Sequence, residues 1–220
     1  MASVPIEFSG EPPDQAVATL KQGGVDICVV DGALSEAERA AVIAAAFAAQ
    51  PGPMLFASIA RNAARPDDVD IVLARPANSD DACKLVEICV RVKIPTRVLI
   101  VDDSSTMRSI IRKILSASRF ALEVDDAAQG IAALDQLASG NYGMVFLDYN
   151  MPDLNGLETL SEIKRVAPNV SVVIMTSTVD NVLADRAQAS GALAFLKKPF
   201  YPDDIDVVLE RYFGLHTEVV

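Results

Sequence analysis

The chain has 220 residues, a length that fits one large domain or two modest ones. Apolar residues make up 51% and charged residues 22% of it, as in ordinary globular proteins, which excludes a disordered chain. The net charge is −11 and both halves are acidic, whereas a nucleic-acid-binding protein needs a positive surface. We therefore expect no nucleic-acid partner.

No membrane or secretory segment is expected. The longest apolar run, residues 40–49, is shorter than the roughly 18 residues that a membrane span needs. The first residues show no basic region followed by an apolar core.

The cysteines Cys28, Cys83 and Cys89 are few and widely spaced, which is typical of free thiols in a reducing compartment. We expect a cytoplasmic protein. Its only histidine is His216, so a zinc or histidine-triad site is not expected.

The first half reads as a short series of strands and helices. Residues 6–31 have the pattern strand, helix, strand. Ser35 and Glu38 form a capping box before an alanine-rich helix, and residues 54–57 are the next strand. A helix over about 81–93 ends just before Pro95.

The second half alternates strands with amphipathic helices. Its five predicted strands are 97–101, 120–124, 143–147, 170–175 and 193–196. Helices are expected after Ser104 or Ser105, around 131–137, over 157–166 and 181–190, and from Pro202. Five such units predict an α/β fold with a doubly wound parallel sheet and helices on both faces.

The first half resembles a shortened copy of the second. Residues 6–31 parallel 122–148, residues 54–57 parallel 173–176, and Arg75-Pro76 parallels Lys198-Pro199. Nothing in the first half corresponds to residues 97–119. A repeat of this size predicts two domains, 1–95 and 96–220, the first truncated to a four-stranded sheet.

Polar residues gather where the strands of the second half end. Asp102 and Asp103 follow the first strand and Asp148 the third, while Thr176 and Lys198 follow the fourth and fifth. Ligands of open α/β sheets bind at this edge. Three clustered carboxylates need a divalent cation, and oxygen ligands favour Mg²⁺, with Mn²⁺ as a substitute. A lysine and a hydroxyl suit a phosphoryl group, so the set predicts metal-assisted phosphoryl transfer to a carboxylate.

The motifs that carry these residues resemble a known family. Residues 98–104 (VLIVDDS), 145–156 (VFLDYNMPDLNG), 175–177 (MTS) and 195–200 (FLKKPF) are similar to the signatures of bacterial response-regulator receiver domains of the CheY type. The resemblance covers about 97–215. It implies a flavodoxin-like sheet with strand order 2-1-3-4-5.

The resemblance also implies roles for the acidic residues. Asp148 would accept a phosphoryl group from a phosphohistidine on a sensor histidine kinase or a histidine phosphotransfer protein. Asp103, Asp148 and the backbone carbonyl of Asn150 would bind Mg²⁺ directly, and Asp102 would bind it through water.

Three further residues receive roles by the same resemblance. Lys198, before a cis bond to Pro199, would pair with the phosphoryl oxygens. Thr176 would swing inward to bind the phosphoryl group, and the ring of Phe195 at the aromatic switch position would follow it.

The expected function is a phosphorylation-operated switch. No DNA-binding or enzymatic motif is recognised after residue 215, and the only chemistry expected is the protein's own phosphorylation and dephosphorylation. Phosphorylation would change the face formed by the fourth helix, fifth strand and fifth helix of the second half, about 180–213. That face would bind a downstream protein or a second copy of the chain as a homodimer.

The first half departs from the family pattern where the chemistry needs it. Asp31 keeps the acceptor position, but Ala57 occupies the threonine position and Arg75 the lysine position, and the acidic pair has no counterpart. We expect residues 1–95 to be a degenerate receiver, or pseudo-receiver, with Asp31 unphosphorylated.

Two other readings compete with this one. A haloacid-dehalogenase-type aspartyl-phosphate hydrolase also uses a nucleophilic aspartate, but its general acid would fall on Asn150, which cannot donate a proton that way. A flavodoxin-like cofactor-binding protein would need a phosphate-cradling loop after the first strand of the second half, and residues 102–105 do not resemble one.

Overall fold

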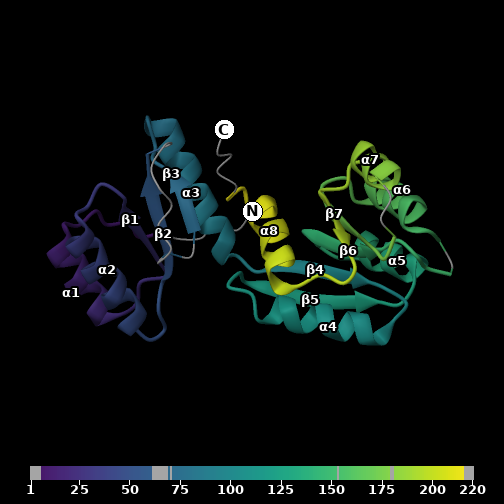
Figure 1. The fold of residues 1–220 in the computed structure, drawn as a ribbon, viewed down its shortest axis with the longest axis horizontal. Coiled ribbons are helices and arrows are strands. Elements are labelled where there is room, and N and C mark those ends of the chain that lie inside the picture. Colours follow the sequence, from purple (N-terminus) through teal and green to yellow (C-terminus); the bar gives the residue numbers. More distant parts are fainter. Residues whose placement is uncertain (1–5, 61–68, 70, 153, 179–180, 216–220) are drawn as a thin grey trace. The chain divides into compact units, whose positions relative to one another are not determined.

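The computed structural model describes residues 6–60, 69, 71–152, 154–178 and 181–215. The protein falls into two compact units that divide between Cys89 and Val90, inside helix α3. We call the part up to Cys89 the first unit and Val90–Gly214 the second unit (Figure 1). No helix among the described residues is long and apolar enough to cross a membrane.

The second unit contains five parallel strands in the order β5-β4-β6-β7-β8. Counted along this unit, that order is the predicted 2-1-3-4-5. Its strands are β4 (Thr96–Val101), β5 (Leu122–Ala127), β6 (Met144–Asp148), β7 (Ser171–Thr176) and β8 (Ala194–Lys197). Its helices are α4 (Ser105–Ser116), α5 (Gly130–Ser139), α6 (Gly156–Val166), α7 (Asn181–Ala189) and α8 (Pro202–Phe213).

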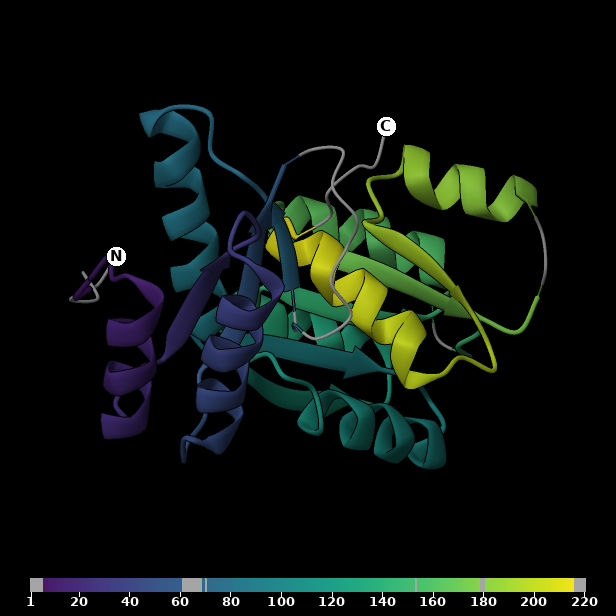
Figure 2. The same ribbon diagram turned by 60° about the vertical axis from the view of Figure 1, so that its left-hand side comes forward.

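Helices cover both faces of this sheet, and the central strands β4, β6 and β7 are correspondingly apolar and buried over most of their length. One face packs its alternate residues, such as Leu99, Val145 and Ile174, against α5, α6 and α7. On the other face α4 contacts α8 (Figure 2). The rings of Phe120 and Phe213 stack there with centroids 4.6 Å apart. The strands are thus held rigidly, so the residues at their ends have fixed positions.

Local capping explains where two of these helices begin. The Ser104 hydroxyl accepts a hydrogen bond from the Met107 amide at the start of α4. Asn155 and Glu158 form a reciprocal capping box at the start of α6. Both helices therefore start directly after the loops that follow β4 and β6.

The described residues of the first unit form three parallel strands, in the order β1-β2-β3. Its elements are α1 (Pro13–Gln22), β1 (Ile27–Asp31), α2 (Glu36–Ala48), β2 (Met54–Ile59), β3 (Ile71–Ala74) and α3 (Ser79–Lys93), the last of which continues into the second unit. Helices α1 and α2 lie side by side, and their apolar residues Leu20, Val42 and Ala46 pack against Val30 and Leu55 of the sheet (Figures 1 and 2).

The prediction of four strands for the first half is wrong for the described residues. Residues 6–12 form no strand, and Ile6 and Phe8 are 55% and 79% exposed. In the second unit the corresponding strand, β5, pairs only with β4. The first half has no counterpart of β4, so the expected strand lacks the neighbour that its backbone would need.

The remaining strands of the first unit repeat the geometry of the second. In β1 and β2, Asp31 pairs with Ser58, just as Asp148 pairs with Met175 in β6 and β7. The amide after each aspartate donates to the carbonyl of that partner, at 2.7 Å for Ser58 and 2.8 Å for Met175. Asp31 therefore occupies the position of Asp148, as predicted.

The same register corrects one prediction. The amide of Arg75 donates to the carbonyl of Ile59 at 2.7 Å, and the amide of Lys198 donates to that of Thr176 at the same distance. Arg75 thus corresponds to Lys198, but Ile59, not Ala57, corresponds to Thr176. An isoleucine at this position has no hydroxyl to offer a ligand.

Candidate functional site

The predicted site residues of the second unit lie together at the carboxyl ends of its strands. Asp148 and Thr176 are the last residues of β6 and β7, Asp102 directly follows β4, and Lys198 directly follows β8. The parallel pairing of these strands brings their ends to one edge of the sheet.

Three carboxylates form a cluster at this edge. One oxygen from each of Asp102, Asp103 and Asp148 lies within 4.8 Å of the others. Asp102 is completely buried and Asp148 is 5% exposed, while Asp103 is exposed. Within the described part of the chain, no other group of three such side chains comes as close together.

Lys198 joins two of these carboxylates. Its Nζ donates to Asp102 Oδ2 at 2.7 Å and lies 3.0 Å from Asp148 Oδ1. The lysine side chain is only 13% exposed. The peptide bond between Lys198 and Pro199 is cis, as expected.

The backbone around the cluster fixes the two buried acids. The amide of Asp102 donates to the Ala127 carbonyl at 3.2 Å, and the Ser104 amide donates to Asp102 Oδ1 at 2.9 Å. The Asn150 amide donates to Asp148 Oδ1 at 3.4 Å, so the loop after β6 turns back over its last residue.

The charge balance of the cluster fits a divalent cation. Burial raises the pKa of Asp148 above its ordinary value, although the neighbouring Lys198 ammonium opposes this shift. Three carboxylates face one ammonium, so the site has an excess of negative charge when all are ionised. An oxygen-rich donor set with such an excess is what Mg²⁺ requires.

The two predicted switch residues lie on the neighbouring strands β7 and β8. Thr176 is completely buried, and its Oγ1 accepts a hydrogen bond from the Thr178 amide at 3.2 Å. Phe195 on β8 is partly buried and packs against the core below α5, α6 and α7. The phenylalanine ring is thus in contact with the core in this conformation.

Sequence reasoning missed one arginine that contacts this site. Arg108, one turn into α4, donates from Nη1 to the carbonyl of Asp102 at 2.7 Å and to that of Asp103 at 3.3 Å. The available signal was the pair Arg108 and Arg112, four residues apart on one helix face, opposite the acidic end of β5 at Asp126.

The matching place in the first unit has different chemistry. The guanidinium of Arg75 pairs with Asp31, whose Oδ1 also accepts a hydrogen bond from the Ala33 amide at 2.9 Å. The side chains of Asp31 and Arg75 are 56% and 42% exposed. No cluster of three acidic, histidine or cysteine side chains lies at this place among the described residues.

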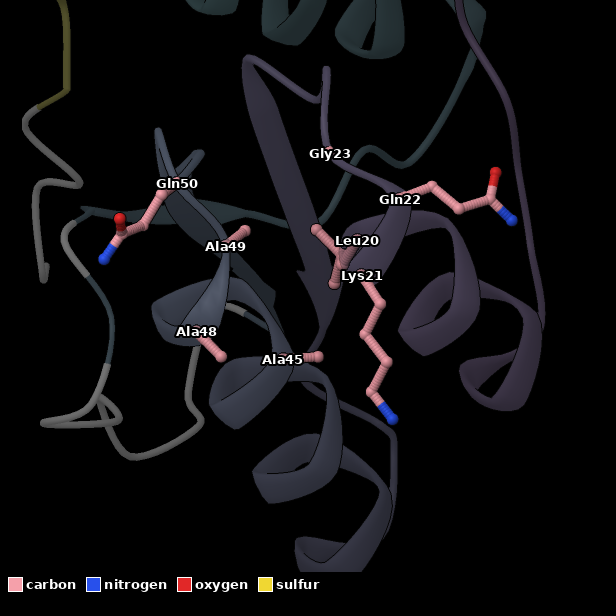
Figure 3. A pocket seen from close by; sticks show the side chains of 8 residues that line it. All are labelled: Leu20, Lys21, Gln22, Gly23, Ala45, Ala48, Ala49 and Gln50. Carbon is pink, nitrogen blue, oxygen red and sulfur yellow. The ribbon is translucent and has the colours of Figure 1, made fainter.

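A shallow pocket of about 200 Å³ lies elsewhere in the first unit, between the last turns of α1 and α2. Leu20, Ala45, Ala48 and Ala49 line it, and the amides of Gln22 and Gln50 point away from it (Figure 3). Lys21 is the only charged residue of this lining. His216, the one histidine of the chain, lies outside the described residues.

Known proteins match the second unit. The profile of the response regulator receiver domain family matches residues 98–210. The two-component response regulator ORR11 of Oryza sativa subsp. indica is 38% identical over 120 residues, which are 53% of this chain and 80% of that protein. Chemotaxis protein CheY of Thermotoga maritima is 28% identical over 115 residues, which are 52% of this chain and 95% of that protein.

Solved structures agree with these matches. The response regulator receiver domain protein from Clostridium thermocellum superposes with a TM-score of 0.50 and 28% identity, over 54% of this chain and 94% of that one. The signal receiver domain of a LuxO repressor protein from Vibrio parahaemolyticus has a TM-score of 0.52 at 23% identity, over 55% of this chain and 92% of that one. The latter similarity supports the fold.

Proposed function

Because the chain belongs to the response regulator receiver family, which residues 98–210 match, we propose that it is a phosphorylation-operated switch with Asp148 as its phosphoryl acceptor. The observation that carries this proposal is the juxtaposition of Asp148 with two further carboxylates and with the Lys198 ammonium at 3.0 Å. The family assignment favours this function over an aspartyl-phosphate hydrolase.

A divalent cation, Mg²⁺ or Mn²⁺, would be held by Asp103, Asp148 and the backbone carbonyl of Asn150, with Asp102 acting through water. When bound, it would neutralise the negative charge that develops on the transferred group. The near-complete burial of Asp102 and Asp148 supports this role, since buried carboxylates bind metal ions or cationic side chains when ionised.

The transfer itself would be a displacement at phosphorus. A carboxylate oxygen of Asp148 attacks the phosphoryl group of a phosphohistidine on a sensor kinase or phosphotransfer protein. The new O–P bond forms as the P–N bond breaks, and the imidazole nitrogen keeps the electron pair. Lys198 stabilises the charge on the transferred oxygens, because its Nζ already lies beside Asp148 Oδ1. Apart from this transfer, the only chemistry we propose is the protein's own dephosphorylation.

Thr176 and Phe195 would convert this event into a change of surface. The Thr176 hydroxyl would donate to a phosphoryl oxygen and give up its contact with the Thr178 amide. That movement vacates space beside β8, into which the Phe195 ring moves from its partly buried position. The consequence is a new packing of α7, β8 and α8.

The face formed by these elements has apolar side chains available for a protein partner. Val182 on α7, Tyr201 before α8 and Val207 on α8 are 65%, 67% and 52% exposed. We propose that a downstream protein or a second copy of the chain binds this face, as the sequence predicts. All three cysteines are free, which fits a cytoplasmic protein.

The first unit would be a pseudo-receiver, kept for binding rather than phosphorylation. It offers Ile59 at the threonine position and ties its aspartate, Asp31, to Arg75. It also lacks a counterpart of β4, the strand before the acidic pair. We retain 1–95 and 96–220 as the proposed domains.

Intact-mass measurement after incubation with Mg²⁺ and a small phosphodonor tests this function. We expect one phosphoryl group on the wild-type protein, none on Asp148→Asn, and one on Asp31→Asn. Omission of Mg²⁺ should abolish the labelling. Labelling that persists in Asp148→Asn, or that is lost only in Asp31→Asn, would contradict the assignment of the acceptor.

A further inference from the structure

Arg108 of α4 connects the backbone of the acidic pair to the neighbouring strand. Its Nη1 binds the carbonyl oxygens of Asp102 and Asp103, at 2.7 Å and 3.3 Å. Its Nε donates to Asp126 Oδ2 at 2.9 Å, and the arginine side chain is 18% exposed. One guanidinium thus holds two successive peptide groups and one carboxylate.

These two peptide groups need an external donor. They lie where β4 has ended and α4 has not yet begun, outside the regular hydrogen bonds of sheet and helix. The guanidinium is rigid and planar: its Nη1 donates to both carbonyls while its Nε is held by Asp126, so the orientation of the two peptide planes is fixed. Asp103 is exposed, and the direction of its carboxylate depends on its backbone rather than on burial.

Asp126 holds Arg108 in place, and its second partner, Arg112, serves as a control residue for comparison with Arg108. It pairs with Arg108 and also with Arg112, one helical turn further along α4. Arg112 carries the same charge as Arg108, but its second contact is the carbonyl of Val124 in β5, not the acidic loop. Both arginines therefore neutralise Asp126, but only Arg108 contacts the backbone of Asp102 and Asp103.

We propose that Arg108 is a positioning residue of the metal site: it orients the peptide groups of Asp102 and Asp103 so that their carboxylates converge on the ion. This inference rests on the proposed binding of Mg²⁺ by the acidic cluster. Partners that orient metal ligands in this way typically change metal affinity by about 10- to 100-fold when they are removed.

Calorimetric titration of the full chain with Mg²⁺ tests the inference. We compare the wild type with Arg108→Ala, Arg108→Lys and the matched control Arg112→Ala. We expect the Kd for Mg²⁺ to rise about tenfold in Arg108→Ala. Arg108→Lys should recover part of this loss, because the shorter lysine has a single donor nitrogen and cannot contact the two carbonyls and Asp126 at the same time. Arg112→Ala should bind Mg²⁺ as the wild type does.

The sign of the effect separates positioning from simple electrostatics. Removal of a positive charge near three carboxylates would by itself strengthen cation binding. A purely electrostatic role therefore predicts a lower Kd in both alanine variants and an unchanged Kd in Arg108→Lys. The unfolding midpoint of each variant in EDTA checks that the second unit is folded, and Arg108→Lys carries the comparison if Arg108→Ala does not fold.

The outcomes are distinct. Weaker binding in both Arg108 variants, with Arg112→Ala unchanged, supports positioning by Arg108. Equal or tighter binding in the Arg108 variants, or an equal loss in Arg112→Ala, overturns it. A wild-type protein that binds no Mg²⁺ contradicts the proposed function itself, and the role of Arg108 then fails with it.

Discussion

Replacement of Lys198 by methionine measures how much the lysine charge contributes to folding by neutralising the acidic cluster. Methionine keeps most of the length and apolar surface of the lysine stem, but removes the ammonium that lies 2.7 Å from Asp102 and 3.0 Å from Asp148. Both carboxylates are almost fully buried, so the variant leaves two adjacent negative charges without their cation. Loss of one partner of a buried ion pair typically costs about 3–5 kcal/mol of folding free energy.

Protonation of a carboxylate sets an upper limit on this cost. A carboxyl group with an unfolded pKa of about 3.9 can take up a proton at pH 7 for about 4 kcal/mol, and at pH 5 for about 1.5 kcal/mol. In metal-free Lys198→Met we therefore expect a loss of about 3–4 kcal/mol at pH 7 that shrinks to about 1.5 kcal/mol at pH 5. Linkage gives the direction of this pH dependence. A carboxyl whose pKa is higher in the folded state than in the unfolded state makes the protein less stable as the pH rises.

Urea unfolding in EDTA, followed by tyrosine fluorescence, measures this loss in the right part of the molecule. All four tyrosines lie in the second unit and the chain has no tryptophan, so the signal reports on that unit. Lys197→Met is the matched control, since Lys197 is exposed at the end of β8. A loss below about 1 kcal/mol at pH 7, or an equal loss at pH 5 and pH 7, would refute the reasoning.

Three further predictions follow from the described contacts. Burial raises the pKa of Asp148, so the metal-free wild type should lose stability relative to Asp148→Asn as the pH rises from about 4 through that raised pKa, measured by urea unfolding across pH. Arg75→Ala should change the free energy of unfolding by less than about 1 kcal/mol, because its ion pair with Asp31 is about half exposed; a larger loss by circular dichroism would contradict this. Gly156→Ala should lower the free energy of unfolding by about 1–3 kcal/mol, because a Cβ there would lie 2.7 Å from the backbone Cα of Tyr149. Gly10→Ala, with open space around it, should leave that free energy unchanged when both variants are followed by circular dichroism.

The sequence predicted the acidic, threonine and lysine residues of the candidate site because each of them lies at the end of an apolar strand or one or two residues after it. Asp102, Asp148 and Thr176 could be placed from strand ends alone, since parallel strands in one sheet end at one edge. Arg108 could not be placed in this way. Its partners are backbone carbonyls, which every residue carries, and only the path of the chain shows which carbonyls it reaches.

The errors in the fold have physical causes. Strand β5 ends later than predicted, at Ala127, and the charges of Asp125 and Asp126 within it are matched by Arg97, Arg108 and Arg112. The segment around Ile6 has the apolar pattern of a strand but no neighbour with which to pair.

The misplaced threonine counterpart has a different origin. An ungapped comparison of 54–57 with 173–176 assigned Ala57, whereas β2 continues two residues further and ends at Ile59. Strand lengths of this kind depend on pairing with β3, which a short window of sequence does not contain.

The register shared by β1-β2-β3 and β6-β7-β8 bears on the history of the chain. The copied portion carries the aspartate, threonine and lysine positions, whereas the acidic pair belongs to β4, outside the copy. A duplication of that extent would produce, in a single event, a module with the acceptor geometry but without the acidic pair. The absence of that pair would require no later decay. Such a module would be silent toward kinases from its origin and free to diverge as a binding surface.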